Sequence, residues 1–240
     1  MACKSNEKKY NIFILLSVFA KSMGEVYIPL VLYNSGFDIV QIFFYFLVKH
    51  VIAAVTFYPI IKLGQKIGFK YLMASSSFFL GLTFYLLTNL ESLVPSLVII
   101  AIMHSLFTQL YWAGRHYYVL EIIPKQGMCN EVGKILIASQ IALIPSAFIG
   151  AVIIENFGLG YLTLIIVALV LVSTIPIFSI KEQPVKKTIN IKKVFKEMPK
   201  RSMALMGIEQ AGFLATVFFP LFIYLQVVDS YQYVGLLNLF

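Results

Sequence analysis

The chain has 240 residues, of which 60% are hydrophobic and 12% are charged, and its mean hydropathy is +0.86. A water-soluble domain carries about twice that charged fraction, so the composition excludes an ordinary soluble globular protein. The net charge of +8 would suit a nucleic-acid-binding protein, but the basic residues follow a membrane topology instead, and we expect no nucleic-acid partner.

Seven apolar stretches follow one another along the chain. Each has about 20 residues, roughly enough for an α-helix to cross a bilayer core of about 30 Å. Helices are expected because backbone groups in lipid must be satisfied within their own segment. The predicted fold class is therefore an all-α polytopic membrane protein. We place the spans at residues 11–33, 39–61, 70–89, 93–113, 131–154, 159–180 and 202–228, with an eighth that begins near Tyr231 and stops at Phe240.

Basic residues cluster before the first span and in every second connection. The other connections, at 34–38, 90–92, 155–158 and 229–230, contain no Lys or Arg. Because basic connections lie on the cytoplasmic side, this alternation predicts a multi-pass protein of the plasma (inner) membrane with a cytoplasmic N-terminus. The most basic connection, 181–201, is interpreted as a cytoplasmic linker with an amphipathic helix, and its residues 186–201 are expected to contact anionic lipids of the inner leaflet.

An internal repeat relates the first span to the seventh. With an offset of 191 residues, 26–41 aligns with 217–232, and six of the 16 positions are identical. Six spans separate the copies, so both cross the membrane in the same direction, as in proteins built from two parallel six-helix halves. We therefore divide the chain into an N-terminal six-helix bundle at 1–180, the linker at 181–201 and the start of a C-terminal bundle at 202–240.

These features resemble the major facilitator superfamily, and the resemblance covers all 240 residues. The family has an Asp–basic–x–Gly–basic–basic motif after its second span. This chain matches it at Lys66, Gly68 and Lys70. It departs from it at Gln65, which replaces the Asp, and at Phe69, which replaces a basic residue. The resemblance implies two rocking six-helix halves, with a gating role for the Lys66–Gly68–Lys70 loop. Because the family has twelve spans, we expect this chain to be a truncated or partial form.

Charged and polar side chains inside the predicted spans mark the candidate site. A charge at the centre of a membrane helix costs about 2.5–3.5 kcal/mol, so such residues usually serve a function. Lys21 and Glu25 are spaced i, i+4 on span one, and Tyr45 and Lys49 have the same spacing on span two. Further polar residues are His104, Thr108 and Gln109 on span four and Glu209 on span seven.

Lys21, Lys49 and His104 fall at similar depths, about 15 Å from one end of their spans at about 1.5 Å per residue, and Glu209 lies slightly nearer the inner end. A transporter's site is expected in such a midplane layer. Plainer interpretations remain for each residue. Lys21 and Glu25 could form a local ion pair that only neutralises itself, and His104 could be a hydrogen-bonded packing residue. The aromatic residues Tyr111, Trp112, Tyr117 and Tyr118 are interpreted as an interfacial aromatic belt.

The function implied by the resemblance is secondary active transport of a small solute by alternating access, coupled to protons. In this hypothesis, Lys21 and Lys49 offer positive charge to an anionic or zwitterionic solute. Glu25 and Glu209 carry protons, and His104, Thr108 and Gln109 supply hydrogen bonds.

Two alternatives stay open, a multidrug-type exporter and a non-transporting membrane sensor or scaffold on the same fold. The sequence has no phosphate-binding Gly-rich loop, no nucleophile–base arrangement and no metal-ligand spacing. We therefore expect neither an enzyme nor a cofactor or metal site.

Overall fold

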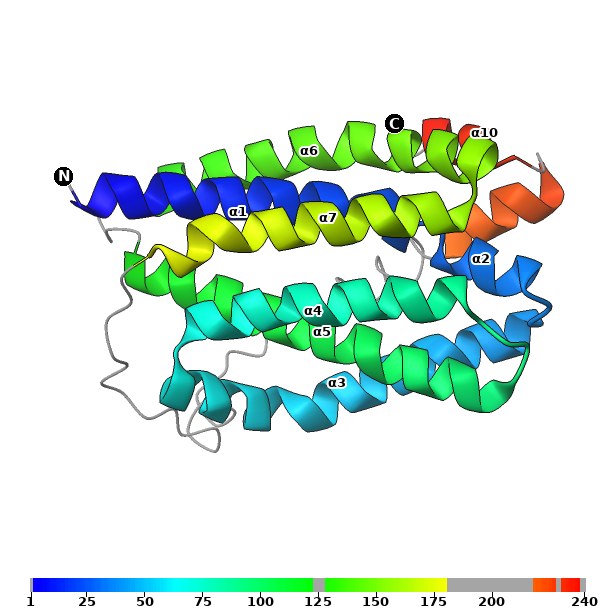
Figure 1. Cartoon of the computed structure of the whole chain (residues 1–240), viewed down its shortest axis with the longest axis horizontal. Coiled ribbons are helices and arrows are strands. Elements are labelled where there is room, and N and C mark those ends of the chain that lie inside the picture. Colours follow the sequence, from blue (N-terminus) through cyan, green and yellow to red (C-terminus); the bar gives the residue numbers. More distant parts are fainter. Residues whose placement is uncertain (1, 123–127, 181–217, 228–229, 238–240) are drawn as a thin grey trace.

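The computed structural model describes residues 2–122, 128–180, 218–227 and 230–237 (Figure 1). These residues form helices and no strand, which confirms the predicted all-α class. The helices are α1 (Ala2–Glu25), α2 (Ile28–Asn34), α3 (Ile39–Ile67), α4 (Phe69–Thr88), α5 (Val94–Ile122), α6 (Met128–Phe157), α7 (Leu159–Phe178) and α10 (Tyr231–Leu237). Residues 218–226 are also helical.

Six helical segments are long and apolar enough to cross a membrane, and they overlap the first six predicted spans. They are Asn6–Asn34, Ile39–Ile67, Phe69–Thr88, Val94–Tyr117, Val132–Phe157 and Leu159–Phe178. The chain is therefore a multi-pass membrane protein. Of the predicted seventh span, 202–228, the described part is the helix at 218–226, and α10 coincides with the start of the predicted eighth. The predicted linker 181–201 lies outside the described residues.

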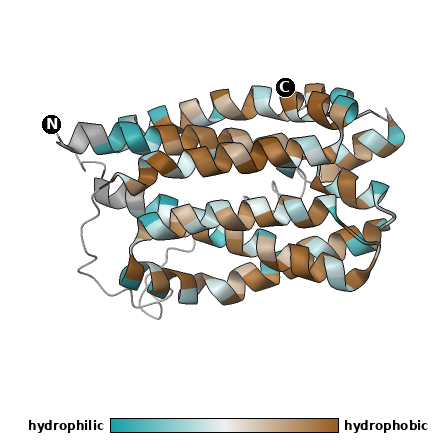
Figure 2. Ribbon diagram, viewed as in Figure 1, coloured by the Kyte–Doolittle hydropathy of each residue, from teal (hydrophilic) through white to brown (hydrophobic). Residues whose placement is uncertain are grey.

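Large apolar side chains cover the outside of these helices. On α3, Val40, Leu47 and Val55 are 60–75% exposed, and on α7 Leu164 and Ile175 are 66% and 67% exposed. Figure 2 shows hydrophobic residues along the full length of the bundle and hydrophilic ones concentrated near helix ends. Soluble proteins do not expose contiguous apolar surface on this scale, so this surface is the one that contacts lipid.

The helices pack as two groups of three. One group contains α1, α6 and α7, the other contains α3, α4 and α5, and α4 and α7 pack together where the groups meet (Figure 1). The pairing is symmetric between the first three spans and the next three. The α1–α7 and α1–α6 pairs of one group correspond to the α5–α4 and α5–α3 pairs of the other, and the α4–α7 pair corresponds to itself. Helices α1 and α5 thus hold equivalent places, one in each group.

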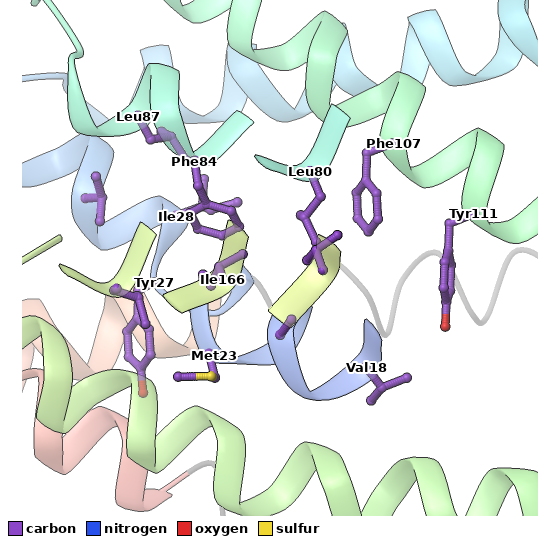
Figure 3. Packing of buried hydrophobic residues seen from close by; sticks show 14 of the residues in the cluster. Val18, Met23, Tyr27, Ile28, Leu80, Phe84, Leu87, Phe107, Tyr111 and Ile166 are labelled. Atoms are coloured by element: carbon purple, nitrogen blue, oxygen red, sulfur yellow. The ribbon is translucent and has the colours of Figure 1, made fainter. Parts of the chain in front are cut away.

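Buried apolar side chains fill the space between the two groups. Figure 3 shows Leu80 and Phe84 of α4, Phe107 of α5 and Ile166 of α7 meeting side chains from α1 and α2. Each of these four is at most 3% exposed. This core contains side chains of α1 and α5, two of the helices that carry polar residues of the predicted site.

The first span is broken beside Glu25. Helix α1 ends at Glu25, and α2 begins at Ile28 with Pro29 in its first turn. Proline has no backbone N–H, so Pro29 cannot donate to the carbonyl four residues before it, which belongs to Glu25. The break places the Glu25 side chain at a helix end inside the bundle.

The segment 218–237 contacts one end of the bundle. Asn34, at the end of α2, donates hydrogen bonds to the hydroxyls of Tyr224 (3.2 Å) and Tyr231 (2.7 Å). Near the end of α6, the Glu155 carboxylate accepts hydrogen bonds from the Ser230 hydroxyl (3.0 Å) and the Gln232 backbone N–H (2.9 Å). Glu155 therefore caps the first turn of α10 from a neighbouring helix, since the first N–H groups of a helix lack partners within it.

Helices α1 and α6 approach each other closely at Gly150. A Cβ atom built at this glycine would overlap the backbone carbonyl of Met23, whereas a Cβ at Gly133, earlier on α6, would meet nothing within 4 Å. Small residues at such crossings allow membrane helices to pack through their backbones. Gly150 thus has a packing role between α1 and α6.

We expect Gly150→Ala to lower the free energy of unfolding by about 1–3 kcal/mol, because the added methyl group must push α6 away from α1. Thermal or SDS-induced unfolding of the purified protein measures the change. Gly133→Ala is the matched control on the same helix and is expected to be neutral or slightly stabilising. Equal effects of the two substitutions would contradict the close approach at Gly150.

Candidate functional site

Lys21 and Glu25 form an ion pair on α1. Their spacing of four residues places both side chains on one face of the helix, and the Lys21 Nζ to Glu25 Oε2 distance is 3.4 Å. The side chains are 24% and 22% exposed, so the ion pair is mostly buried but keeps some exposed surface. The pair that the sequence predicted is therefore present.

His104 of α5 connects this ion pair to α3. Its Nε2 lies 3.2 Å from Glu25 Oε1, and its Nδ1 lies 2.6 Å from the hydroxyl oxygen of Tyr45 on α3. His104 and Tyr45 are 2% and 0% exposed. With Glu25 ionised, its oxygens can only accept, so Nε2–H donates to Glu25 and Nδ1 of the neutral ring accepts from Tyr45.

His104 is hydrogen-bonded and buried, as its plainer interpretation expects, and its two contacts link Glu25 of α1 to Tyr45 of α3. A role of His104 in binding a solute stays a prediction. Lys21, Glu25, His104 and Tyr45 form one continuous chain of polar contacts, which we call the α1–α3–α5 network. It connects three spans, those of α1, α3 and α5. A carboxylate and an imidazole in hydrogen-bond contact can pass a proton between them.

Lys49 lies beside the network on α3, one helical turn from Tyr45. It is 4% exposed, and its ammonium nitrogen lies 5.9 Å from the ring centre of Phe46. Its charge interacts electrostatically with that of Glu25. A lysine this deep in a span cannot reach the water interface, so its charge acts inside the bundle. The structure thus brings four of the predicted site residues together: Lys21, Glu25, Lys49 and His104.

Lys21 also faces two aromatic rings of α5. Its Nζ lies 5.9 Å from the ring centre of Tyr111 and 5.8 Å from that of Trp112, within the usual range of cation–π contacts. The guanidinium of Arg115 lies over the same Trp112 ring at 4.9 Å. Tyr111 is 2% exposed and belongs to the core, so its interpretation as part of an interfacial aromatic belt is wrong. Arg115 itself is 9% exposed.

Two of the predicted hydrogen-bonding residues stand apart from the network. The Thr108 hydroxyl donates to the His104 carbonyl oxygen of its own helix at 2.9 Å, which satisfies it locally. Gln109 is half-buried and makes no hydrogen bond to another described residue. Glu209, the other predicted proton carrier, lies outside the described residues.

The loop residues Lys66, Gly68 and Lys70 lie at the tight junction between α3 and α4. Gly68 alone separates the two helices and has φ +101°, a conformation that favours glycine. Lys70 donates a hydrogen bond to the Ile180 carbonyl oxygen (3.0 Å), just beyond the end of α7. Lys66 is exposed in the last turn of α3. The junction therefore ties one group of helices to the end of the other.

Sequence reasoning missed Tyr111 and Arg115 as site residues. It noted Tyr45 for its spacing of four residues from Lys49 on span two, but it gave Tyr45 no role. For Tyr111 and Arg115 the sequence offers no such signal, because aromatic and basic residues near a span end are typical of any interface. Among the described residues, no group of three His, Cys, Asp and Glu side chains is placed to hold a metal ion.

We expect Tyr45→Phe to lower the free energy of unfolding by about 1–3 kcal/mol, because the buried Nδ1 of His104 would lose its partner. Chemical unfolding of the two proteins in the same detergent measures the difference. Tyr85→Phe, at a tyrosine that is 59% exposed on α4, is the matched control and is expected to change little. A stability of Tyr45→Phe equal to that of the control would contradict the hydrogen bond.

No protein-family model matches this sequence, and no curated protein matches it. The fold and the α1–α3–α5 network are therefore the grounds on which a function can be proposed. That network places ionisable groups in the interior of a multi-pass membrane protein.

Proposed function

We propose that this protein is a secondary active transporter that moves a small charged solute by alternating access and couples its movement to protons. The observation that carries the proposal is the α1–α3–α5 network. Hydrogen-bonding networks of this kind occur in many soluble proteins, but burying charged side chains within a membrane-spanning bundle is costly. Such groups mark solute and proton paths in membrane proteins.

The geometry supports proton coupling through Glu25. Its two carboxylate oxygens face different partners, Lys21 on one side and His104 on the other. Protonation of Glu25 would weaken both contacts at once, because a neutral carboxyl neither attracts the ammonium nor accepts in the same way from the imidazole. A proton would thereby change the contacts between α1 and α5, one from each group of helices.

The packing of the bundle supports the resemblance to the major facilitator superfamily. Transporters of that kind contain inverted repeats of three spans within each six-helix half. The symmetric pairing of α1, α3 and α4 with α5, α6 and α7 is what such a repeat would produce, since an offset of three spans reverses the direction of crossing. The contacts of Asn34 and Glu155 with the segment 218–237 suit the place where a second half would begin.

We expect Glu25→Gln to abolish solute-driven proton movement, because a glutamine cannot take up or release the proton. The protein is reconstituted into liposomes that contain a pH-sensitive dye. Monocarboxylates, amino acids and organic amines are then added in turn to find a solute that changes the internal pH. Glu91→Gln, at an exposed position between α4 and α5, is the matched control and should behave as the wild type.

A Glu25→Gln protein that moves protons at the wild-type rate would overturn the coupling role of Glu25. A wild-type protein that moves protons with none of these solutes would count against transport itself.

The proposed orientation places the N-terminus in the cytoplasm of a cell whose plasma membrane holds the protein. Cysteines introduced at two exposed positions test it, Lys66→Cys in the last turn of α3 and Glu91→Cys between α4 and α5. The background carries Cys3→Ser and Cys129→Ser, which removes both native thiols. A membrane-impermeant maleimide added to intact cells should label the cysteine at position 91 and should label that at position 66 only after permeabilisation. The reverse pattern would invert the topology.

A further inference from the structure

Two cations lie on the single tryptophan of the chain. Trp112 is contacted by Lys21 Nζ at 5.8 Å and by the Arg115 guanidinium at 4.9 Å. Arg115 is 9% exposed, yet within the described residues no carboxylate forms an ion pair with it. A buried charge is normally paired, because its removal from water is costly. The surroundings of Arg115 therefore favour a negatively charged ligand.

The hydroxyl of Tyr111 adds a donor beside these cations. It is buried and makes no hydrogen bond within the described part of the chain, although buried hydroxyls are nearly always paired. Figure 3 shows the ring extending from α5 with its hydroxyl pointing away from that helix. Leaving such a group unpaired is costly, and a ligand that accepts its hydrogen bond would remove that cost.

The Lys21 ammonium also has N–H donors available for a ligand. An ammonium carries three N–H groups, and the contact of Lys21 with Glu25, at 3.4 Å, is longer than a typical charged hydrogen bond. Its remaining contacts within the described residues are with the faces of the Tyr111 and Trp112 rings, which use no directed hydrogen bond. The ammonium is thus held in place and can still donate to a further acceptor.

We propose that Lys21, Tyr111, Trp112 and Arg115 form a subsite for the carboxylate of a small organic anion. The carboxylate accepts hydrogen bonds from the Tyr111 hydroxyl and from one or both cations, and the apolar body of the solute lies against Trp112. This inference rests on the proposed transport function and names the chemical class of the solute. An organic cation would have to displace Lys21, which is tethered over both rings and already pairs with Glu25.

The fluorescence of Trp112 reports on binding directly, because no other tryptophan is present. The full chain, purified in detergent, is titrated with cyclohexanecarboxylate, which does not absorb at the excitation wavelength. Cyclohexanecarboxamide and cyclohexylammonium have the same apolar body and serve as the neutral and cationic comparisons. We expect a saturable change in fluorescence with the carboxylate and no saturable change with the other two at the same concentrations.

Two variants test the named contacts. Tyr111→Phe keeps the ring and removes the unpaired hydroxyl, so it should fold at least as well as the wild type and raise the Kd about tenfold. Arg115→Gln removes the second cation and should raise the Kd by at least as much. The matched controls are Tyr161→Phe, at a tyrosine that is 62% exposed, and Lys8→Gln, at an exposed lysine of α1, and both should leave the Kd unchanged.

A saturable response to cyclohexylammonium in place of the carboxylate would overturn the proposal, and so would a Kd of Tyr111→Phe equal to that of the wild type. The absence of a response to all three compounds would overturn it too. Solute-driven proton movement in liposomes without any change in Trp112 fluorescence would contradict the proposed subsite but not the proposed transport function. If the carboxylate binds but no solute drives proton movement, the result would support the proposed subsite and contradict the proposed transport function.

Discussion

A carboxylate inside a membrane bundle needs partners of opposite charge or donor groups, and this requirement organises the interior of the protein. Glu25 meets it with Lys21 on its own helix and His104 on α5, and Tyr45 then completes the hydrogen bonding of the imidazole. Any shift of α1 against α5 would leave buried polar groups unpaired. The relative position of these helices is therefore constrained by polar contacts as well as by the apolar core.

The symmetric packing explains why these two helices carry the network. Each of α1 and α5 packs against the other two members of its own group, so each presents its remaining face to the opposite group. Polar residues on that face meet across the boundary between groups, whereas polar residues elsewhere would meet lipid. The apolar surfaces of α3 and α7 are consistent with this division.

The positions of the first six spans and the Lys21–Glu25 pair could be predicted because they follow from hydropathy and from the pitch of a helix. The contact between Tyr45 and His104 could not, because it depends on how far α3 and α5 rotate about their axes. The same rotation decides whether Tyr111 faces lipid or the core, and neighbouring aromatic residues look alike in sequence. The role of Glu209 stays a prediction, since it lies outside the described residues.

The placement of Lys21 and Glu25 on one helix also bears on the biogenesis of the protein. Helix α1 packs against α6 and α7, which are synthesised last among the first six spans, and His104 follows Glu25 by 79 residues. During translation, α1 must therefore enter the membrane before its neighbours exist. Because Glu25 already has Lys21 one turn away, the nascent helix can leave the insertion machinery with its charges paired. A lysine supplied by a later span could not provide that protection.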